Sequence, residues 1–317
     1  MKPYARLQLV ATRAGFSSVD EAVRLASDSN DAWRIGDSVL RICWRGDPQR
    51  LHREALLLER LPSSVPHPQL LGVGDVNGLS WTVTRWVADA PNLTDVWHSM
   101  PKRDRDSAVA QLAAAMESLH GWEPDDLVRQ GLAQRAPAAT ITDVLGADLN
   151  PLPIDRALRL IEPARQVRHV DPDVIGALAN RLESLRHVDD LNSDGGVVVH
   201  GDLHLNNIMW SGSRIAAIVD FEWVRLGPAD LELQPLLRPE PGHPPEIVGQ
   251  LARTYPALVA EPHTVDRLWL YDLAFTLRHL LVWPPTAPGS DLPAWHPVRR
   301  LPTMLQGPDY IATLLSG

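Results

Sequence analysis

The sequence contains very little lysine and cysteine for its length. Among 317 residues there are two lysines, Lys2 and Lys102, and all other basic residues are arginines. Cys43 is the only cysteine, which excludes an intrachain disulfide and a metal site built from several cysteines. A single thiol is compatible with a reducing compartment, so we expect a cytoplasmic protein. The scarcity of lysine matters because a cation required inside the fold then has to be an arginine.

Long apolar runs are also missing. No segment approaches the ~20 apolar residues of a membrane-spanning helix, and residues 269–283 are interrupted by Asp272, Arg278 and His279. The start of the chain carries Arg6 and Arg13, so we expect no secretory signal there. The formal net charge is −9, and basic residues alternate with acidic ones. This argues against nucleic acid or an anionic membrane as a partner.

The chain does contain a dense group of polar residues near predicted strand ends. The apolar run Val197–Val199 predicts a buried strand, and His-Gly-Asp, ending at Asp202, follows it. Asn207 lies five residues later, and a second apolar run, residues 215–219, ends at Asp220. Carboxylate and carboxamide oxygens suit Mg²⁺, which keeps several waters and shares phosphate oxygens with its substrate. A carboxylate beside such a metal can also accept a proton from an attacking hydroxyl.

The order HGD-x4-N, followed by a strand that ends in DFE, resembles the aminoglycoside phosphotransferase and choline kinase family of small-molecule kinases. These enzymes are structural relatives of protein kinases, whose motifs are HRD-x4-N and DFG. Gly201 replaces the arginine and Glu222 replaces the last glycine, and both departures favour the small-molecule branch. Residues 227–231 resemble the family's later Gly-x-x-Asp-Leu segment, in which we expect Asp230 to brace the catalytic loop. A plain hairpin with surface Asp and Asn explains any one of these positions, but not all of them in this order.

The resemblance implies an α+β, bilobal, protein-kinase-like fold. Residues 1–86 would form a small N-terminal nucleotide-binding lobe, an antiparallel sheet with one helix. Residues 87–317 would form a larger, mainly helical lobe for catalysis and acceptor binding. The residue pattern agrees, because it predicts strands over 23–25, 33–35, 38–44, 70–76 and 79–86, and helices over 50–61, 104–119, 153–167 and 171–185. Asn77-Gly78 predicts a tight hairpin between two of these strands.

Arg41 matches the strand position at which the family holds the α- and β-phosphates, usually with lysine. Neither lysine can serve, because Lys2 is terminal and Lys102 precedes a later helix. The resemblance assigns Glu54, on the following helix, as the carboxylate that pairs with Arg41, and Glu59 is the second candidate. The alternatives are an exposed strand arginine and a surface pair between Glu54 and a neighbouring arginine.

The first loop of the family covers the nucleotide phosphates, but here it contains no glycine. Ser27, Ser29 and Asn30 can still offer small side chains and backbone N–H groups, or they form an ordinary surface turn.

The segment after the last sheet strand corresponds to the kinase hinge. Backbone groups of Trp86, Val87 and Ala88 are expected to meet the adenine edge, and Trp86 can at the same time be a core residue.

The resemblance therefore implies phosphoryl transfer from ATP, with GTP as a possible donor, to a hydroxyl of a small molecule. Asp202 would be the catalytic base, and Asn207 and Asp220 would hold Mg²⁺. His200 is expected to fix the loop by hydrogen bonds, and His204 faces either solvent or phosphate.

The acceptor is left open by the sequence. The resemblance implies an aminoglycoside or another hydroxylated antibiotic or metabolite. The acidic residues within 123–153 are better explained as solvated helix faces than as amine ligands. The alternatives are a protein kinase, which the missing Ala-Pro-Glu segment disfavours, and a catalytically weak or dead nucleotide-binding protein, which the glycine-free first loop favours. Either a monomer or a homodimer is compatible with the sequence.

Overall fold

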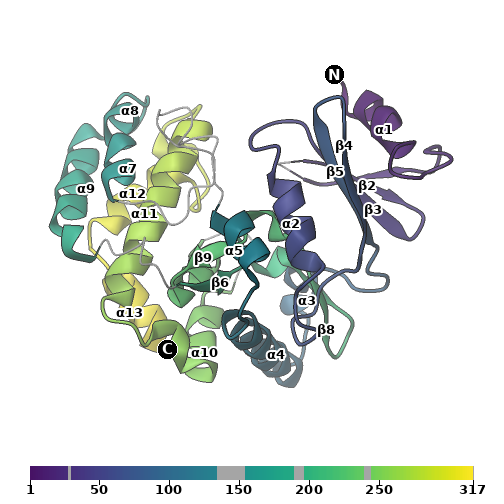
Figure 1. The fold of residues 1–317 in the computed structure, drawn as a ribbon. Coiled ribbons are helices and arrows are strands. Elements are labelled where there is room, and N and C mark those ends of the chain that lie inside the picture. Colours follow the sequence, from purple (N-terminus) through teal and green to yellow (C-terminus); the bar gives the residue numbers. More distant parts are fainter. Residues whose placement is uncertain (28–29, 134–153, 189–195, 239–243, 317) are drawn as a thin grey trace.

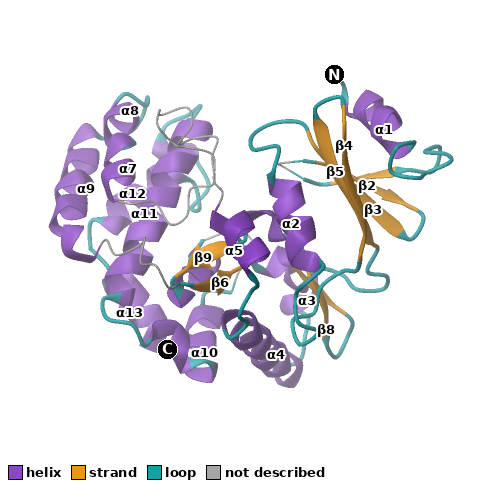
Figure 2. Cartoon of the chain, viewed as in Figure 1, coloured by secondary structure: helices purple, strands orange, loops and turns teal. Residues whose placement is uncertain are grey.

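A five-stranded antiparallel sheet occupies the N-terminal part of the chain in the computed structural model (Figures 1 and 2). The structure describes residues 1–27, 30–133, 154–188, 196–238 and 244–316. The strand order is β1-β2-β3-β5-β4. Its members are β1 (Val23–Leu25), β2 (Asp31–Ile35), β3 (Ser38–Cys43), β4 (Leu70–Val76) and β5 (Leu79–Arg85).

The two faces of this sheet carry different helices. Side chains alternate between the faces of a strand, so Leu40 and Ile42 of β3 pack in a small apolar core with Leu7 and Val10 of α1 (Pro3–Ala11). Arg41 points the other way, toward α2 (Arg50–Leu58). Because α2 lies between the sheet and the helical part of the chain (Figure 1), this alternation places the strand cation at the junction of the two parts.

The β4–β5 hairpin has the turn that its sequence predicts. Asn77 and Gly78 both have positive φ, at 50° and 77°, which is what a two-residue turn that follows the twist of the strands requires. β5 ends at Arg85, just before the predicted division between residues 86 and 87, which stays a prediction.

The remainder is mainly helical and encloses the largest apolar core, with Trp97, Phe221, Trp269 and Tyr271 among its fully buried side chains. Two small antiparallel ladders, β6 with β9 and β7 with β8, carry the polar loop of the sequence motif. The strands are β6 (Val197–Val199), β7 (Ile208–Trp210), β8 (Ile215–Ile218) and β9 (Arg225–Gly227). The helices are α3 (Leu93–Trp97), α4 (Lys102–His120), α5 (Asp126–Ala133), α7 (Ile154–Arg159), α8 (Ile161–Arg165), α9 (Pro172–Ser184), α10 (Glu246–Thr254), α11 (Thr264–Val282), α12 (Pro297–Met304) and α13 (Asp309–Ser316).

One predicted helix is wrong in its continuity. The pattern predicts a single helix over 153–167, whereas the described residues form two short helices, α7 and α8, that meet at Leu160. Pro163 is the reason, because proline lacks the N–H of an interior helical residue and its ring clashes with the carbonyl four residues earlier. A proline is tolerated near a helix start, so α8 begins anew just before it.

None of the helices in the described part of the chain combines the length and the apolar character that a membrane crossing needs.

Candidate active site

The loop after β6 requires glycine at its second position. Gly201 has φ +81°, and a Cβ atom there would lie 2.4 Å from the carbonyl oxygen of Trp223. Residues that carry a Cβ atom rarely adopt a left-handed backbone conformation. The close contact with the Trp223 carbonyl also leaves no space for such an atom. The departure from the protein-kinase arginine is therefore dictated by the packing of the loop against the Phe221–Trp223 turn.

Asp202 follows Gly201 in the loop after β6, and an arginine holds its side chain. Its Oδ1 accepts a hydrogen bond from Arg238 at 2.8 Å, and His204 Nε2 lies 3.5 Å from its other oxygen. Burial by itself would raise the pKa of Asp202, but the Arg238 guanidinium, with smaller effects from His204 and His200, lowers it below the ordinary aspartate range. Asp202 is consequently a carboxylate at neutral pH, and its side chain is 21% exposed.

Hydrogen bonds connect the Asp202 loop to the strand that leads into Asp220. Asn207 Nδ2 donates to the carbonyl of Asp202 at 2.9 Å, and the Asn207 carbonyl accepts from the N–H of Val219 at 2.9 Å. Val219 in turn accepts from His200 Nε2 at 3.0 Å. His200 is fully buried and receives the N–H of Asp202 on Nδ1 at 3.3 Å, so it is the neutral tautomer with the proton on Nε2. This is the loop-fixing arrangement expected for His200.

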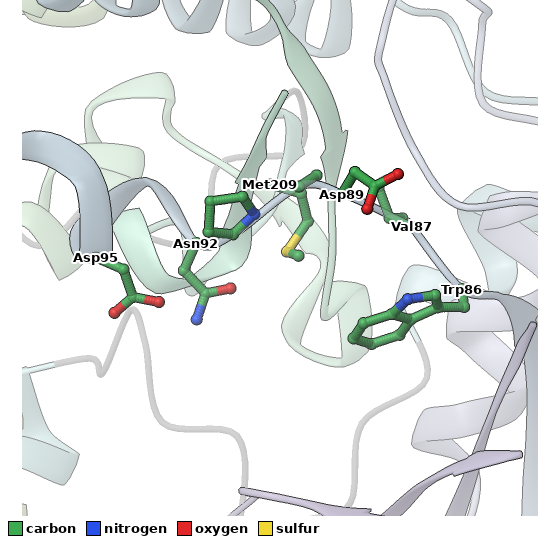
Figure 3. A pocket seen from close by; sticks show the side chains of 8 residues that line it. Trp86, Val87, Asp89, Asn92, Asp95 and Met209 are labelled. Atoms are coloured by element: carbon green, nitrogen blue, oxygen red, sulfur yellow. The ribbon is translucent and has the colours of Figure 1, made fainter. Parts of the chain in front are cut away.

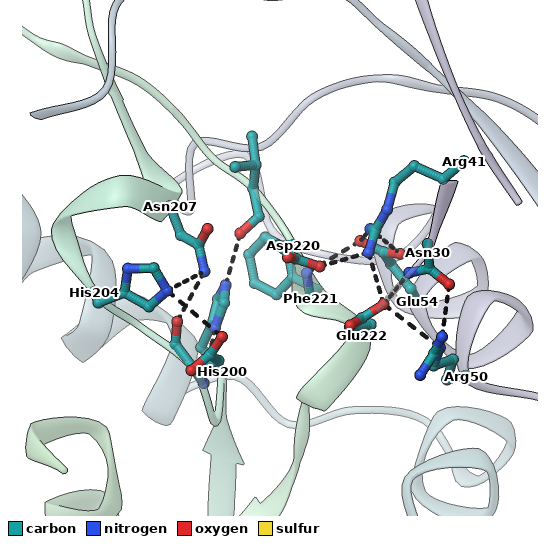
Figure 4. A network of polar contacts seen from close by, with 12 residues as sticks. Asn30, Arg41, Arg50, Glu54, His200, His204, Asn207, Asp220, Phe221 and Glu222 are labelled. Atoms are coloured by element: carbon teal, nitrogen blue, oxygen red, sulfur yellow. Dashed lines mark hydrogen bonds and ion pairs between the residues drawn. The ribbon is translucent and has the colours of Figure 1, made fainter. Parts of the chain in front are cut away.

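Asp220 lies between Asn207 on one side and Arg41 on the other, as Figure 4 shows. Its backbone is left-handed, with φ 68° and ψ 53°, a conformation that aspartate tolerates better than most residues. Its side chain is 34% exposed, and Oδ1 lies 2.5 Å from Arg41. Asn207 lies on the other side of it in the same view, with its amide nitrogen committed to Asp202.

Arg41 and Glu54 form the predicted ion pair between β3 and α2. One guanidinium nitrogen of Arg41 is 2.6 Å from both carboxylate oxygens of Glu54. Glu54 also accepts the N–H of Phe221 at 3.0 Å, which ties α2 to the turn after Asp220. Glu59, the second candidate, pairs instead with Arg60 and is about half exposed. The role of the Arg41–Glu54 pair toward nucleotide phosphate stays a prediction.

Sequence reasoning missed Glu222 as a member of the site. Its carboxylate is 1% exposed and lies 2.7 Å from Arg41 and 3.6 Å from Arg50. It also accepts a hydrogen bond from the side chain of Asn30, whose oxygen accepts from Arg50 at 2.8 Å. Figure 4 shows these side chains converging from β3, α2 and the first loop. One feature of the sequence could have indicated Glu222 as a site residue: this glutamate replaces the glycine that ends the DFG motif.

Three carboxylates therefore share the Arg41 guanidinium. Burial, followed by the neighbouring Asp220 and Glu222, raises the pKa of Glu54 to about 7, although Arg41 opposes this. Counting Arg50 beside Glu222, two arginines face three carboxylates among the described residues, and these five side chains carry one surplus negative charge when all are ionised. An added cation would relieve this repulsion.

The residues predicted to form the first loop differ in their exposure to solvent. Ser27 is exposed, Asn30 is buried in the Glu222 network, and Ser29 lies outside the described residues. Their contacts with nucleotide phosphate stay predictions.

A pocket of about 410 Å³ opens at the predicted hinge (Figure 3). Its lining consists of Trp86, Val87, Asp89, Ala90, Pro91, Asn92, Asp95 and Met209. The volume is in the range of small-molecule sites, and Met209 follows Asn207 by two residues, so the pocket adjoins the candidate metal ligands. Ala88 is exposed and does not line it. The N–H of Trp86 donates to the carbonyl of Asp37 at 2.7 Å and is thus already used.

Buried polar contacts hold the segment that follows β9 in place. Asp230 is 1% exposed and pairs with Arg267 of α11 at 2.5 Å, and the hydroxyl of Tyr271 donates to it at 3.3 Å. Glu232 accepts the backbone N–H of His200. Asp230 thus fixes the segment after β9 to α11, whereas Glu232 is the residue that contacts the catalytic loop; direct bracing of that loop by Asp230 stays a prediction.

A model of the phosphotransferase enzyme family, APH, matches residues 21–266 of the chain. The chain belongs to this phosphotransferase family. The matched segment runs from just before β1 into the first residues of α11, so it contains Arg41, Glu54, Asp202, Asn207 and Asp220. No curated protein sequence matches this phosphotransferase significantly.

Solved structures share the fold of the phosphotransferase at low identity. The GDP and kanamycin complex of APH(2")-IIIa has a TM-score of 0.70 and 17% identity, covering 97% of this chain and 99% of the other. The GDP complex of wild-type aminoglycoside 2'-phosphotransferase-IIIa has a TM-score of 0.67 and 16% identity, covering 98% and 100%. A choline/ethanolamine kinase family protein from Mesorhizobium loti has a TM-score of 0.64 and 20% identity, covering 99% of each chain. The predicted family and the protein-kinase-like fold class are confirmed.

Proposed function

We propose that this phosphotransferase is a cytoplasmic, Mg²⁺-dependent O-phosphotransferase that moves the γ-phosphoryl group of ATP to a hydroxyl of a small molecule. The acceptor would be an aminoglycoside or another hydroxylated antibiotic or metabolite, with no nucleic acid or membrane partner. One observation carries the proposal. Hydrogen bonds run from Asp202 to Asn207 and from Asn207 to Val219, the residue before Asp220, and Asp220 is in turn paired with Arg41, which is paired with Glu54. GTP stays a possible donor, since two of the similar structures are GDP complexes.

The residues present fit a magnesium ion. No cluster of three or more His, Cys, Asp or Glu side chains that suits a metal occurs in the described ranges, but Mg²⁺ in kinase sites needs only one or two protein ligands beside phosphate and water. Asn207 and Asp220 would hold the ion, and the surplus negative charge around Arg41 favours a cation there. A magnesium ion held by these two residues would supply positive charge that offsets the negative charge of the nucleotide phosphates.

Asp202 is suited to orient the acceptor hydroxyl and to take its proton. Its depressed pKa makes it a weak base, which agrees with a loose transition state in which positioning and charge stabilisation dominate. Arg41 would clamp the nucleotide phosphates, and its fork can contact phosphate and carboxylate together. Glu54 positions Arg41 through the bidentate pair.

A weak or dead kinase is the second candidate. The glycine-free first loop favours it, and so does the engagement of Arg41 by three carboxylates, which nucleotide phosphates would have to displace in part. The presence of Asp202, Asn207 and Asp220 in one connected arrangement favours the active enzyme.

A transfer assay tests the proposal. The protein is incubated with Mg²⁺ and γ-labelled ATP or GTP, and with a panel of aminoglycosides, other hydroxylated antibiotics, sugars and amino alcohols, beside a generic protein acceptor. Label is expected on at least one small molecule and not on the protein. Nucleotide binding without transfer to any panel member supports the dead kinase, and label on the protein acceptor supports a protein kinase.

The metal assignment gives a separate prediction. Asp220→Asn removes an anionic oxygen ligand, so it should raise the Mg²⁺ concentration for half-maximal turnover steeply, by ~10-fold or more, and lower kcat. Asn207→Ala should act in the same direction but more weakly. The measurement is a Mg²⁺ titration of initial rates at saturating nucleotide.

Asp75→Asn is the matched control, because Asp75 is an exposed residue of β4 whose carboxylate pairs with His52, and this variant should keep the wild-type titration curve. If Asp220→Asn and Asn207→Ala both keep it as well, these residues do not hold the metal.

A further inference from the structure

The carboxylate of Asp202 is held by an arginine that lies outside the HGD and DFE motifs. Arg238 directly follows a short 3-10 turn, residues 235–237, and its Nη1 donates to Oδ1 of Asp202 at 2.8 Å. The two side chains are 9% and 21% exposed. The pair is therefore largely withdrawn from solvent, and a hydrogen bond between ionised groups is short, strong and directional.

Arg238 is itself fixed by two further groups. A second guanidinium nitrogen donates to Oε1 of Gln234 at 3.0 Å, and Gln234 is fully buried. The guanidinium carbon lies 4.0 Å from the ring centroid of Phe275 on α11, which is within the range of a cation–π contact. An arginine held by a carboxylate, an amide and an aromatic ring keeps little conformational freedom, so its planar fork meets Asp202 from one direction.

The contact engages only one of the two carboxylate oxygens of Asp202. Oδ1 accepts from Arg238, whereas Oδ2 has only a longer contact among the described residues, 3.5 Å to Nε2 of His204. That distance exceeds an ordinary hydrogen bond. The backbone of Asp202 is also fixed, since its N–H donates to His200 and its carbonyl accepts from Asn207. Oδ2 is thus the oxygen left to receive a proton.

We propose that Arg238 is a positioning residue for phosphoryl transfer, which ties Oδ1 of Asp202 and so turns Oδ2 toward the acceptor hydroxyl. This rests on the proposed function and adds to it a residue outside the kinase motifs. In the reaction the acceptor oxygen forms a bond to the γ-phosphorus, the bond from that phosphorus to the β,γ-bridging oxygen breaks, and the nucleoside diphosphate leaves with the electron pair. The hydroxyl proton passes to Oδ2 of Asp202.

Removing Arg238 has two opposite consequences for Asp202. It makes the carboxylate a stronger proton acceptor, because the guanidinium favours the ionised form. It also frees the carboxylate to rotate between its side-chain torsion wells, and a misplacement of ~1 Å can cost ~10²-fold in rate. Because positioning outweighs basicity in a loose transition state, we expect the rate to fall.

Three variants test the proposal in single-turnover assays: Arg238→Ala, Arg238→Lys, and Arg238→Ala combined with Asp202→Ala. The acceptor is the one that the transfer assay identifies, or water, in nucleotide hydrolysis, if that assay identifies none. Arg238→Ala should lower the rate ~10²-fold while nucleotide Kd stays nearly unchanged. Arg238→Lys should restore part of the loss, since lysine keeps the charge without the fork. In the Asp202→Ala background, Arg238→Ala should change the rate by less than about threefold, because residues that act as a unit are non-additive.

Arg300→Ala is the matched control for the loss of a buried ion pair. Arg300 of α12 lies 2.6 Å from Asp272 of α11, and their side chains are 13% and 0% exposed. This variant should lose stability, as proteins do when one partner of a buried pair is removed, but it should keep the wild-type rate. If Arg238→Ala unfolds under assay conditions, Phe275→Leu loosens the arginine from α11 and should lower the rate in the same direction, more weakly.

An unchanged or raised rate in Arg238→Ala overturns the proposal, and so does an equally large effect of Arg238→Ala in the wild-type and Asp202→Ala backgrounds. A second cycle needs no turnover: the losses of unfolding free energy in the two single variants and the double variant should be non-additive, because the side chains are in contact. Additive losses also overturn the proposal. If the wild type neither transfers phosphate nor hydrolyses nucleotide, while nucleotide binding is normal and the unfolding cycle is non-additive, the proposed function alone fails.

Discussion

Replacing Asp202 with alanine is expected to abolish nearly all phosphoryl transfer while leaving nucleotide affinity close to the wild-type value. A positioned proton acceptor contributes about 10²–10⁴-fold to the rate, so kcat should fall by that factor. Among the residues that the structure describes, Asp202 contacts Arg238, His204 and Asn207 but not Arg41, the cation proposed to hold phosphate. Single-turnover rates and nucleotide binding by calorimetry separate the two effects.

Asp202→Asn is the variant of matched shape, since asparagine can still accept a hydrogen bond from Arg238. It should lose as much activity as Asp202→Ala if the carboxylate charge matters, and it should keep more stability. Asp106→Ala, an exposed carboxylate on α4 paired only with Lys102 among the described residues, is the control. If both Asp202 variants keep more than about a tenth of the wild-type rate, the loss is smaller than a positioned base usually contributes. Asp202 would then not be the catalytic base.

The pH dependence of stability gives an independent readout for Asp202. Its folded-state pKa lies below the unfolded value of ~3.9. The stabilisation from its ionised form is therefore fully present above that unfolded value and is lost as pH falls toward the folded one. The unfolding midpoints of wild type and Asp202→Ala should differ at neutral pH and converge in acid. A difference that grows in acid would contradict the ion pair with Arg238.

Replacing Arg41 with alanine should weaken nucleotide binding by the ~2–5 kcal/mol that is typical of breaking a buried charge pair, which corresponds to about 30- to 4,000-fold in Kd. The structure supplies two reasons. The cation proposed to face phosphate is lost, and Glu54, Asp220 and Glu222 are left close together without their shared guanidinium. Arg41→Lys should recover part of the loss, because lysine restores the charge but not the planar fork.

Isothermal titration with ADP and Mg²⁺ measures the effect. Arg24→Ala, on β1 of the same sheet and more than half exposed, is the matched control and should leave Kd nearly unchanged. Arg41→Ala combined with Glu54→Ala should lose clearly less than the sum of the single losses, because the second change removes an unpaired carboxylate. Additive losses would mean that the phosphates are held in another way and would strengthen the case for a dead kinase.

Local sequence patterns were sufficient to predict the strands and loops that carry the catalytic motif. Asn207 and Asp220 flank the β7–β8 hairpin, and Asp202 lies in the short loop between β6 and Asn207, so their proximity follows from short connections and from the pairing of β7 with β8. Apolar alternation in β3 also determines which face Arg41 occupies, and an amphipathic α2 places Glu54 opposite it. Such features depend on residues close in sequence, where chain geometry leaves few alternatives.

The sequence by itself thus determined the family, the fold class and the core of the candidate site. Only the tertiary structure decided which partners surround that core. Arg238 reaches Asp202 from 36 residues away, and Glu222 joins Asn30 across 192 residues. Arg238 also lies over the ring of Phe275, so α11 packs against the arginine that holds Asp202. No periodicity or motif encodes these contacts, because they depend on how separately formed elements pack, and the burial that strengthens their charges exists only once the packing is complete.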